Sequence, residues 1–417
     1  MSIEKMDDKY TVSIAWGAWD GDSLMELSIP SRWHADVCTI ADAPRLGAKK
    51  IREALQNSFS ASSLRDLARE KQKIVVALED ITRPARLERV LQSLISEFKA
   101  AGVKKKHISF IVCNGAHAPM SRAEMVSKFG ANIVRDFLVL NHNPYENLAE
   151  TGVVLGKTPV RINRLFYEAD LKIALGSIIP HSFAGFSSGA KLVLPGLSDM
   201  ATLERSHKYV MMGFRGGVND VEANKFRLEI EEVVAKIGLD CFIGVVPNSN
   251  REVAGVFAGN VVDAHRAGVN FARQVFCTNI RESYDVVVLN AYPKDSELLQ
   301  ADTALTALKT TKKEIVKEGG VLVVVSKCSR GLGHHSLFGP GMPLYRRPIK
   351  RRSLLGRDLI LFTPNINQAE FQLLYWNGYR LANSWEAVIS LLKKRFPGEC
   401  SIAILPFAPL QLLQCPI

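Results

Sequence analysis

The sequence predicts an α/β protein with two domains of mainly parallel sheet flanked by helices, and an active site in the interdomain cleft. Three observations support this fold class. The 417 residues are enough for two or three domains at roughly 150 residues each. Hydrophobic residues make up 47% and charged residues 23%, as in ordinary globular proteins. Short β-branched apolar runs alternate with amphipathic helical stretches, which is typical of parallel sheets with helical crossovers.

The first series of elements occupies about the first two thirds of the chain. Apolar runs predict buried strands, and stretches with helical periodicity follow them. Strands are expected at 73–78, 107–113, 171–176 and 241–246, and helices at 84–102 and 259–276.

The second series begins after residue 284. Strands are expected at 285–290, 321–325, 359–362 and 401–405, with a helix that ends near residues 319–320. This arrangement predicts an N-terminal domain (1–272), a hinge (273–284) and a C-terminal domain (285–417). Because open parallel sheets bind ligands beyond the carboxyl ends of their strands, we expect function in the turns that follow these strands.

The charge and cysteine content limit the expected binding partners and the cellular compartment of the protein. Lys+Arg total 53 and Asp+Glu 42, so the net charge is +11, which suits an acidic small molecule or nucleic acid. The basic residues are scattered apart from short clusters at 104–106 and 346–352, so we expect a small anion and no nucleic acid. Seven cysteines without CxxC spacing indicate neither a disulfide framework nor a zinc ribbon. No apolar run reaches the roughly 18 residues of a membrane span, so we expect a cytoplasmic protein without membrane contact.

The first motif, Asp-Ile-Thr-Arg-Pro at 80–84, follows the strand at 73–78. Pro84 suits the first turn of a helix, whose free amide groups can meet an anion. Asp80 and Thr82 can hold hydroxyl groups, and Arg83 can bind a carboxylate or phosphate through its planar guanidinium. The alternative is that Asp80 only caps the helix and Arg83 pairs with a surface acid.

The second motif, Asn-Gly-Ala-His-Ala-Pro at 114–119, follows the next strand. His117 stands where the strand turns toward a helix, and its near-neutral pKa range suits proton transfer in both directions. A lone loop histidine is otherwise only polar surface.

The third motif spans residues 180–196 and is the densest in functional side chains. His181, three serines, Gly185 and Gly189 precede Lys191, so that backbone amides can approach a phosphate and the lysine adds a charge or a nucleophile. It is not a Walker A loop, because the glycines are separated by only three residues. The alternative is a Gly/Ser turn with an exposed lysine.

Three further segments carry candidate side chains. His207 lies on a helix-like segment, and together with His117 and His181 it leaves a tri-histidine zinc site open, although no HExxH spacing is present. In the second domain, Tyr292 and Gln300 follow a strand and are expected to point across the cleft, unless Gln300 is merely solvent-facing. The glycine loop at 326–335 ends in paired histidines.

Taken together and in chain order, these motifs resemble the lactate racemase family, whose members use a nickel-pincer nucleotide. The resemblance implies that Lys191 joins this pyridinium-3,5-bisthiocarboxylic acid mononucleotide through a thioamide, and that His207 completes the coordination of the nickel. Lys191 and His207 are thus the expected metal-site residues. The pincer supplies two sulfurs and a carbon, so one nitrogen closes a square plane suited to Ni(II).

The resemblance also assigns the remaining roles. His117 and His181 are implied to be the paired acid/base groups. The implied cofactor- and substrate-binding residues are Asp80, Ile81, Thr82 and Arg83 for the nucleotide, and Arg83, Tyr292 and Gln300 for the substrate. The implied reaction is racemisation or epimerisation of a 2-hydroxy acid, in which the α-hydrogen leaves as hydride while a base takes the hydroxyl proton. Cofactor-synthesis and nickel-insertion proteins are implied partners.

The chain departs from the family at two positions. Thr303 stands three residues after Gln300, where lactate racemases have a substrate-binding lysine, so a substrate other than lactate is expected. The 180–196 loop also has a serine where the family commonly has glycine.

Two other functions remain open from the residues alone. A nucleotide-dependent dehydrogenase agrees with two α/β domains, but no convincing GxGxxG connects a strand to a helix. A non-catalytic protein could hold an anionic metabolite with Arg83 and the 185–191 loop.

Overall fold

The structure, a computed structural model, describes residues 3–6, 9–212 and 217–413. The chain divides into two compact units: unit 1 comprises Met1–Ala41 and Phe276–Ile417, and unit 2 comprises Asp42–Val275. Each unit contains a six-stranded, mostly parallel sheet, which confirms the predicted α/β fold class.

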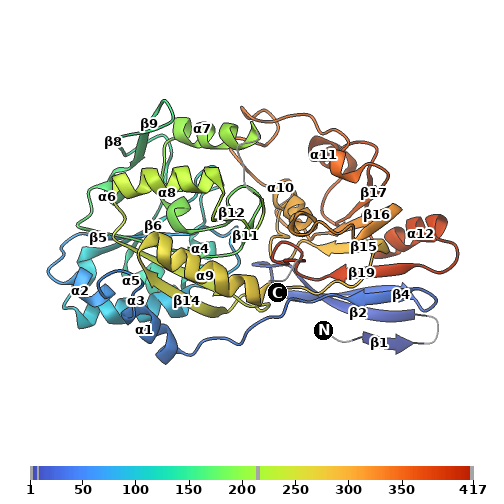
Figure 1. Cartoon of the computed structure of the whole chain (residues 1–417), viewed down its shortest axis with the longest axis horizontal. Coiled ribbons are helices and arrows are strands. Elements are labelled where there is room, and N and C mark those ends of the chain that lie inside the picture. The colour runs from blue at the N-terminus through green and yellow to red at the C-terminus, as the bar shows by residue number, and fades with distance from the viewer. Residues whose placement is uncertain (1–2, 7–8, 213–216, 414–417) are drawn as a thin grey trace. The chain divides into compact units, whose positions relative to one another are not determined.

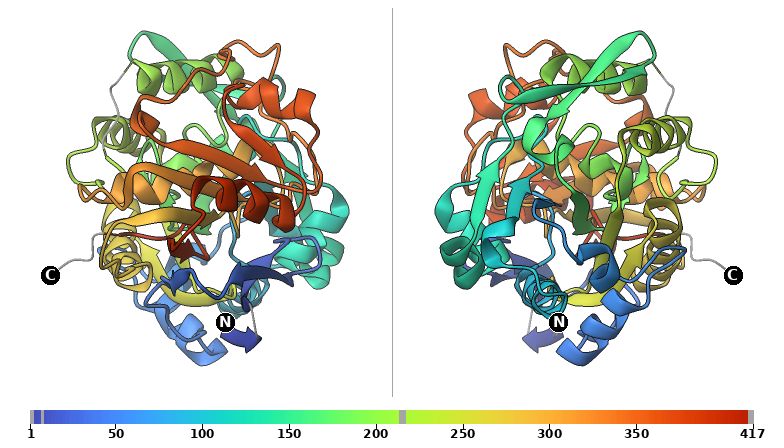
Figure 2. Two further views of the ribbon diagram at one scale, coloured as in Figure 1. Left: turned by 90° about the vertical axis from the view of Figure 1, so that its right-hand side faces the viewer. Right: turned by 90° about the vertical axis from the view of Figure 1, so that its left-hand side faces the viewer.

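Unit 2 is built on a sheet of strand order β14-β13-β10-β5-β6-β7, in which only β14 is antiparallel to its neighbour. Helices lie on both faces of this sheet (Figures 1 and 2), and β5 accordingly has no exposed residue. The strands of unit 2 are β5 (Ile74–Leu78), β6 (Ile108–Val112), β7 (Leu138–Asn141), β8 (Leu148–Leu155), β9 (Thr158–Asn163), β10 (Leu171–Ser177), β11 (Pro180–His181), β12 (Gly185–Phe186), β13 (Cys241–Pro247) and β14 (Val253–Gly259). Its helices are α1 (Ala48–Gln56), α2 (Leu64–Ala68), α3 (Glu88–Ala100), η1 (Lys105–His107), α4 (Arg122–Phe129), α5 (Ala131–Asp136), α6 (Arg164–Tyr167), η2 (Gly189–Leu192), α7 (Met200–Met211), α8 (Lys225–Ile237) and α9 (Val261–Val275).

Unit 1 is built on a wholly parallel sheet of order β18-β17-β16-β15-β19-β4. Alternate residues of β15 enter two cores: Val287 packs with α10, η3 and α11, whereas Val286 packs with the β2–β3 hairpin and α12. The strands of unit 1 are β1 (Ile3–Met6), β2 (Lys9–Trp16), β3 (Ser23–Pro30), β4 (His34–Val37), β15 (Tyr284–Asn290), β16 (Val316–Val325), β17 (Asp358–Phe362), β18 (Arg380–Ala382) and β19 (Ser401–Leu405). Its helices are α10 (Leu298–Ala301), η3 (Asp302–Thr310), η4 (Arg352–Leu354), α11 (Gln368–Leu374) and α12 (Trp385–Arg395).

The compact units differ from the predicted domains at the N-terminus. The first 41 residues group with residues 276–417, and not with the segment up to residue 272. The reason is that β4 adds to the edge of the unit 1 sheet by parallel pairing with β19, from Ser401 opposite His34 to Ile404 opposite Val37. The junction between Val275 and Phe276 falls within the expected hinge at 273–284.

The expected helix end at residues 319–320 is wrong. Both glycines lie inside β16, which begins at Val316. The pairing register between β15 and β16 shifts at this point, and Gly319 adopts a φ of +73°, a conformation that glycine tolerates at a bulge.

The described residues show the state of six cysteines and the character of the helices with respect to a membrane. Cys277 is disulfide-bonded, a bond that the cysteine spacing did not indicate, whereas five buried cysteines are free thiols: Cys38, Cys113, Cys241, Cys328 and Cys400. In the described part of the chain, no helix combines the length and apolar character that crossing a membrane requires.

Candidate functional site

Three neighbouring strands of unit 2 carry the motifs of the first half of the chain. β10, β5 and β6 are parallel, and Leu78 at the end of β5 pairs with both Leu175 and Val112. Their carboxyl ends therefore share one edge of the sheet. The turn after β5 holds Asp80 to Arg83, the turn after β6 holds His117, and the loop after β10 holds His181 and Lys191.

Asp80 binds both Thr82 and His117. Its Oδ2 lies 2.5 Å from Nδ1 of His117, and its Oδ1 accepts hydrogen bonds from the Thr82 amide at 2.9 Å and hydroxyl at 2.5 Å. Arg83 donates to the Thr82 hydroxyl at 2.9 Å. Burial opposes ionisation, but His117, Arg83 and Thr82 together hold the pKa of the Asp80 carboxyl well below its usual range. Since a carboxylate only accepts hydrogen bonds, the proton of the neutral His117 ring belongs on Nδ1.

Pro84 does not open the following helix. α3 begins at Glu88, four residues later than expected. The ammonium of Lys128 accounts for the difference, because it donates to the carbonyl groups on both sides of Pro84, at 2.7 and 3.1 Å. Residues 79–87 therefore form a turn of their own, and the anion-binding helix start expected at Pro84 is absent.

His181 and Lys191 are in direct contact across the loop that follows β10. Nε2 of His181 lies 2.9 Å from Nζ of Lys191. Nδ1 of His181 accepts from the amides of Phe183 and Ala184 at 3.1 and 3.4 Å. An accepting Nδ1 places the proton of the neutral ring on Nε2, which is the reverse of the arrangement at His117. This tautomer requires that Nζ of Lys191 is an uncharged amine that accepts the Nε2 proton, because an ammonium group only donates.

Buried side chains from two helices hold this loop by its carbonyl groups. Arg227 of α8 donates from Nε to the Ala184 carbonyl at 2.9 Å and from Nη2 to the Phe186 carbonyl. His265 of α9 donates to the Ser187 carbonyl at 2.9 Å. Arg227 and His265 have no exposed surface, so the loop that presents Lys191 rests on buried polar support.

Gly185 shows how closely this loop is packed. It has a φ of +71°, and a Cβ atom there would lie 1.9 Å from the carbonyl oxygen of Asp220. Only glycine satisfies both the backbone conformation and the close approach.

His207 lies on α7 with one ring nitrogen engaged. Nδ1 is 2.8 Å from the Leu203 carbonyl and carries the ring proton, so Nε2 has the lone pair. Burial lowers the pKa of His207 to about 4 against the effect of that carbonyl, and positive charge on Lys191 and His117 lowers it further. A ring that stays neutral at neutral pH is suited to metal coordination.

These residues fit a metal carried by an organic cofactor. In residues 3–6, 9–212 and 217–413, no group of three or more His, Cys, Asp or Glu side chains could hold a metal ion, so the tri-histidine zinc alternative gains no support. A nickel-pincer nucleotide requires one protein nitrogen and one amine, which His207 and Lys191 provide. The same loop also has a buried hydroxyl, Ser188 Oγ, with no hydrogen-bond partner among the described residues, and this polar atom suits a polar ligand.

Unit 1 carries the two expected substrate residues. Tyr292 follows β15 and is only 5% exposed, with its hydroxyl 3.5 Å from Asp22 Oδ1. Gln300 lies on α10 and is partly buried, and its carbonyl accepts a hydrogen bond from the Thr303 hydroxyl at 2.7 Å. Asp302, beside Thr303, accepts hydrogen bonds from Nη1 and Nη2 of Arg351.

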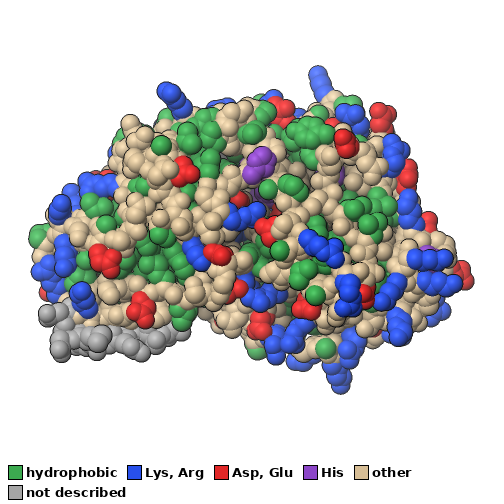
Figure 3. Space-filling model, turned by 180° about the vertical axis from the view of Figure 1, so that it is seen from behind, with side chains coloured by type: hydrophobic (Ala, Val, Ile, Leu, Met, Phe, Trp, Pro, Cys, Tyr) green, Lys and Arg blue, Asp and Glu red, His purple; other side chains and the backbone are tan. Residues whose placement is uncertain are grey.

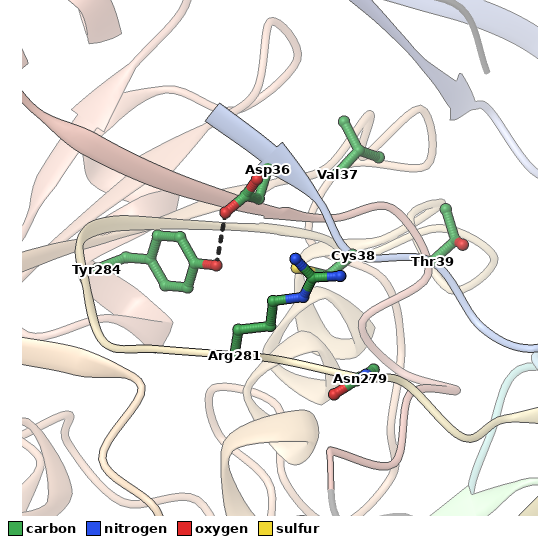
Figure 4. Close-up of a pocket in the computed structure, with 7 residues that line it drawn as sticks. All are labelled: Asp36, Val37, Cys38, Thr39, Asn279, Arg281 and Tyr284. Carbon is green, nitrogen blue, oxygen red and sulfur yellow. Dashed lines mark hydrogen bonds between the residues drawn. The ribbon is translucent and has the colours of Figure 1, made fainter. Parts of the chain in front are cut away.

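A separate polar pocket lies in unit 1 where β4 ends and β15 begins (Figure 4). It has a volume of about 350 Å³, and the Tyr284 hydroxyl donates to Asp36 at 2.8 Å in its wall. None of the sequence-predicted site residues lines it. On the face seen in Figure 3, Lys and Arg side chains are dispersed among acidic ones, as the scattered basic residues of the sequence suggest.

Sequence reasoning missed the buried groups that support the site. Glu79, Lys128, Arg227 and His265 are each less than 3% exposed. Glu79 directly precedes a motif residue, and this position at the end of an apolar strand was a usable signal. Lys128, Arg227 and His265 lie in ordinary amphipathic helices, where nothing in the local pattern distinguishes them from surface residues.

Comparison with known proteins agrees with the motif pattern. Residues 21–216 match the family described as lactate racemase N-terminal domain. The lactate racemase of Thermoanaerobacterium thermosaccharolyticum is 30% identical over 294 residues, which cover 69% of this chain and 67% of that protein. The lactate racemase of Lactiplantibacillus plantarum is 28% identical and covers 69% of this chain and 68% of its own.

Solved structures share the fold. The lactate racemase apoprotein of T. thermosaccharolyticum superposes with a TM-score of 0.76 at 22% identity and covers 97% of this chain and all of that chain. A Thermotoga maritima protein superposes with a TM-score of 0.68 at 18% identity, over 90% of this chain and all of its own.

Proposed function

The chain belongs to the lactate racemase family, a relationship that supports racemase activity on a 2-hydroxy acid, and from this premise we propose a mechanism with His117 and His181 as the acid/base pair. Lys191 is the proposed attachment point of a nickel-pincer nucleotide, and His207 is the proposed nickel ligand. Tyr292 and Gln300 of unit 1 are the proposed substrate-binding residues.

The opposite hydrogen-bond environments of the two histidines carry the proposal. Nδ1 of His117 faces the Asp80 carboxylate, so the neutral ring has its lone pair on Nε2 and acts as a base. Nδ1 of His181 accepts backbone amides, so the neutral ring has its proton on Nε2 and can donate a hydrogen bond from it to the substrate oxygen. As the acid of the pair, His181 would give up a proton from its imidazolium form and be left as the neutral ring. A racemase needs one group that accepts the substrate's hydroxyl proton and a second that returns a proton on the opposite side.

The remaining residues of the site bind and orient the reactants. Arg83 binds the substrate carboxylate through its guanidinium, which its bond to the Thr82 hydroxyl holds in place. Asp80 keeps His117 in the tautomer that accepts a proton and stabilises the imidazolium that results. In the opposite reaction direction, His181 is the base and His117 the acid.

The cofactor supplies the chemistry that these side chains lack. Held by Lys191 and His207, a nickel-pincer nucleotide would supply a reversible hydride acceptor for the α-hydrogen of the substrate. Asp80, Ile81, Thr82 and Arg83 are the proposed nucleotide-binding residues. Cofactor-synthesis and nickel-insertion proteins are the proposed partners.

We assign the substrate to 2-hydroxy acids other than lactate. The hydroxyl of Thr303, which replaces the family's lysine, is turned back onto the Gln300 carbonyl and brings no positive charge. Without that cation a small carboxylate loses one anchor, which favours a larger, more polar or differently anchored substrate.

The test is to produce the protein in cells that synthesise the cofactor, and to measure its intact mass, its nickel content and its action on a panel of 2-hydroxy acids by chiral chromatography. A mass increase located at Lys191, one nickel per chain and inversion of at least one panel member are expected. Active enzyme with unmodified Lys191 would contradict the cofactor assignment.

A matched pair of variants separates catalysis from simple binding. His117→Asn/His181→Asn should keep the nickel and the added mass but lose turnover, whereas the control His34→Asn, at an exposed histidine of unit 1, should keep all three. Full activity in the double variant would favour the anion-binding alternative.

A further inference from the structure

Lys128 is a fully buried cation directly behind the Asp80–Arg83 turn. Its Nζ donates to Glu79 Oε1 at 2.9 Å, to the Arg83 carbonyl at 2.7 Å and to the Ala85 carbonyl at 3.1 Å. All three partners are acceptors, so the three protons of the ammonium form are used. Because Lys128 has no exposed surface, solvent does not compete for these bonds.

Glu79 extends the same network to the loop that carries His181. Its Oε1 accepts from the Ser177 hydroxyl at 2.7 Å, and its Oε2 accepts from the Ser177 amide. Ser177 is the last residue of β10, and its carbonyl accepts a hydrogen bond from the Ser187 hydroxyl. One carboxylate therefore joins the ends of β5 and β10, from which the two halves of the proposed site depart.

The network also explains why residues 84–87 are not helical. In a helix continued back to Pro84, the Arg83 carbonyl would accept from the Leu87 amide. Here the Arg83 carbonyl binds the side chain of Lys128, and the Leu87 amide donates to the backbone carbonyl of Lys128 at 2.9 Å. Pro84 is well suited to a first helical turn, so the sequence favours a conformation that Lys128 prevents.

We propose that Lys128 and Glu79 are positioning residues of the active site. Their buried pair keeps the Asp80–Arg83 turn from winding into α3 and fixes it to the end of β10. This sets the spacing between the carboxylate that orients His117 and the loop that presents His181. The catalytic meaning of this spacing rests on the proposed function, but the conformational claim does not.

The first test uses unloaded protein and nuclear magnetic resonance. In Lys128→Met, the 13Cα shifts of residues 84–87 should move toward helical values, and the Nδ1–H signal of His117 should leave its downfield, carboxylate-bonded position. Lys99→Met, which removes an exposed lysine from the end of α3, is the matched control and should change neither.

A double variant separates positioning from stability. Lys128→Met alone leaves the Glu79 carboxylate buried without its cation, so its denaturation midpoint should fall, whereas Glu79→Met/Lys128→Met removes both charges and should recover much of that loss. The NMR changes should persist in the double variant. Wild-type signals at residues 84–87 and His117 in a folded double variant would overturn the proposal.

A milder variant decides the matter if both of these fail to fold. Ser177→Ala removes one hydrogen bond to Glu79 and should shift the ring signals of His117 and His181 together. If neither signal moves, the proposed link between the two loops does not exist.

The last arm uses enzyme loaded with cofactor. The double variant should lose on the order of a hundredfold in kcat/KM, as expected for a small misplacement of reacting groups, with nickel per chain unchanged. If the wild-type enzyme inverts no 2-hydroxy acid, the proposed function fails, while the NMR arm still decides whether Lys128 and Glu79 position the turn.

Discussion

Replacement of Arg227 by methionine tests how strongly the loop that carries Lys191 depends on buried support. The change removes the short bonds to the Ala184 and Phe186 carbonyls, each a charged hydrogen bond that contributes on the order of 1.5–3 kcal/mol. Burial lowers the pKa of Arg227 to about 10, and this desolvation offsets part of the gain. Glu231 is not left unpaired, because Arg266 donates to both of its oxygens at 2.9 and 2.8 Å.

The net loss expected for Arg227→Met is therefore about 3 kcal/mol in the free energy of unfolding. For a unit of this size the melting temperature should fall by about 6–12 °C. The assay is urea denaturation together with amide hydrogen exchange across residues 184–191, which should become faster. Arg52→Met, at an exposed position of α1, is the control and should change the free energy by less than about 0.5 kcal/mol.

Two outcomes would refute this reasoning. A loss below about 1 kcal/mol would mean that the buried guanidinium contributes no more than one ordinary hydrogen bond. Unchanged exchange at residues 184–191 in a destabilised variant would mean that Arg227 supports α8 and not the loop.

Three further predictions concern pH, loading and specificity. Burial lowers the pKa of His142 to about 4, whereas the pKa in the unfolded chain is about 6.5. The contribution of His142 to folding stability is therefore fully present above about pH 6.5 and is lost as the pH falls toward 4, because the unfolded chain binds the proton first. His142→Gln keeps a donor for the Ser198 carbonyl but cannot bind a proton. Between pH 7 and 4.5 its free energy of unfolding, measured by urea denaturation, should fall by about 2–3 kcal/mol less than that of the wild type. An identical fall in both proteins would contradict the assignment. Lys191→Arg should abolish the mass increase in cofactor-producing cells, and a modified variant would place the attachment elsewhere. Thr303→Lys should raise kcat/KM for lactate at least about tenfold relative to larger 2-hydroxy acids, as expected for one restored charged contact; an unchanged ratio would show that residue 303 does not select the substrate.

The sequence predicted the parts of the fold that repeat locally. The strands expected at 73–78 and 241–246 correspond to β5 and β13, because apolar β-branched runs identify strands buried on both faces. The long helix expected at 259–276 corresponds to α9, whose apolar residues recur with helical periodicity.

Long-range pairing was beyond such reasoning. The start of α3 is displaced from Pro84 by Lys128, which lies more than 40 residues away along the chain. The first 41 residues join unit 1 because β4 pairs with β19. A strand of four residues has too short a sequence pattern for its pairing partner to be predicted. Both differences from the expected pattern arise where a distant partner satisfies backbone groups that local propensity would have paired otherwise.

Candidate site residues divide in the same way. His117, His181 and Lys191 could be named as candidates because they lie in glycine-containing turns just after apolar strands. Glu79 and Lys128 were not, since a buried ion pair between distant segments looks like two ordinary surface charges in the sequence.

The strand order of unit 2 gives a physical reason for the positions of the two proposed acid/base groups. The chain passes from β5 to β6 on one side, and later returns to place β10 on the other side of β5. β5 is thus the point at which the order of the sheet reverses, where open α/β sheets bind their ligands. His117 follows β6 and His181 follows β10, so their loops leave from opposite sides of the Asp80–Arg83 turn. The proposed reaction takes up and returns a hydroxyl proton at two mirror-related positions, and a sheet with a single reversal provides flanking groups for this without internal symmetry.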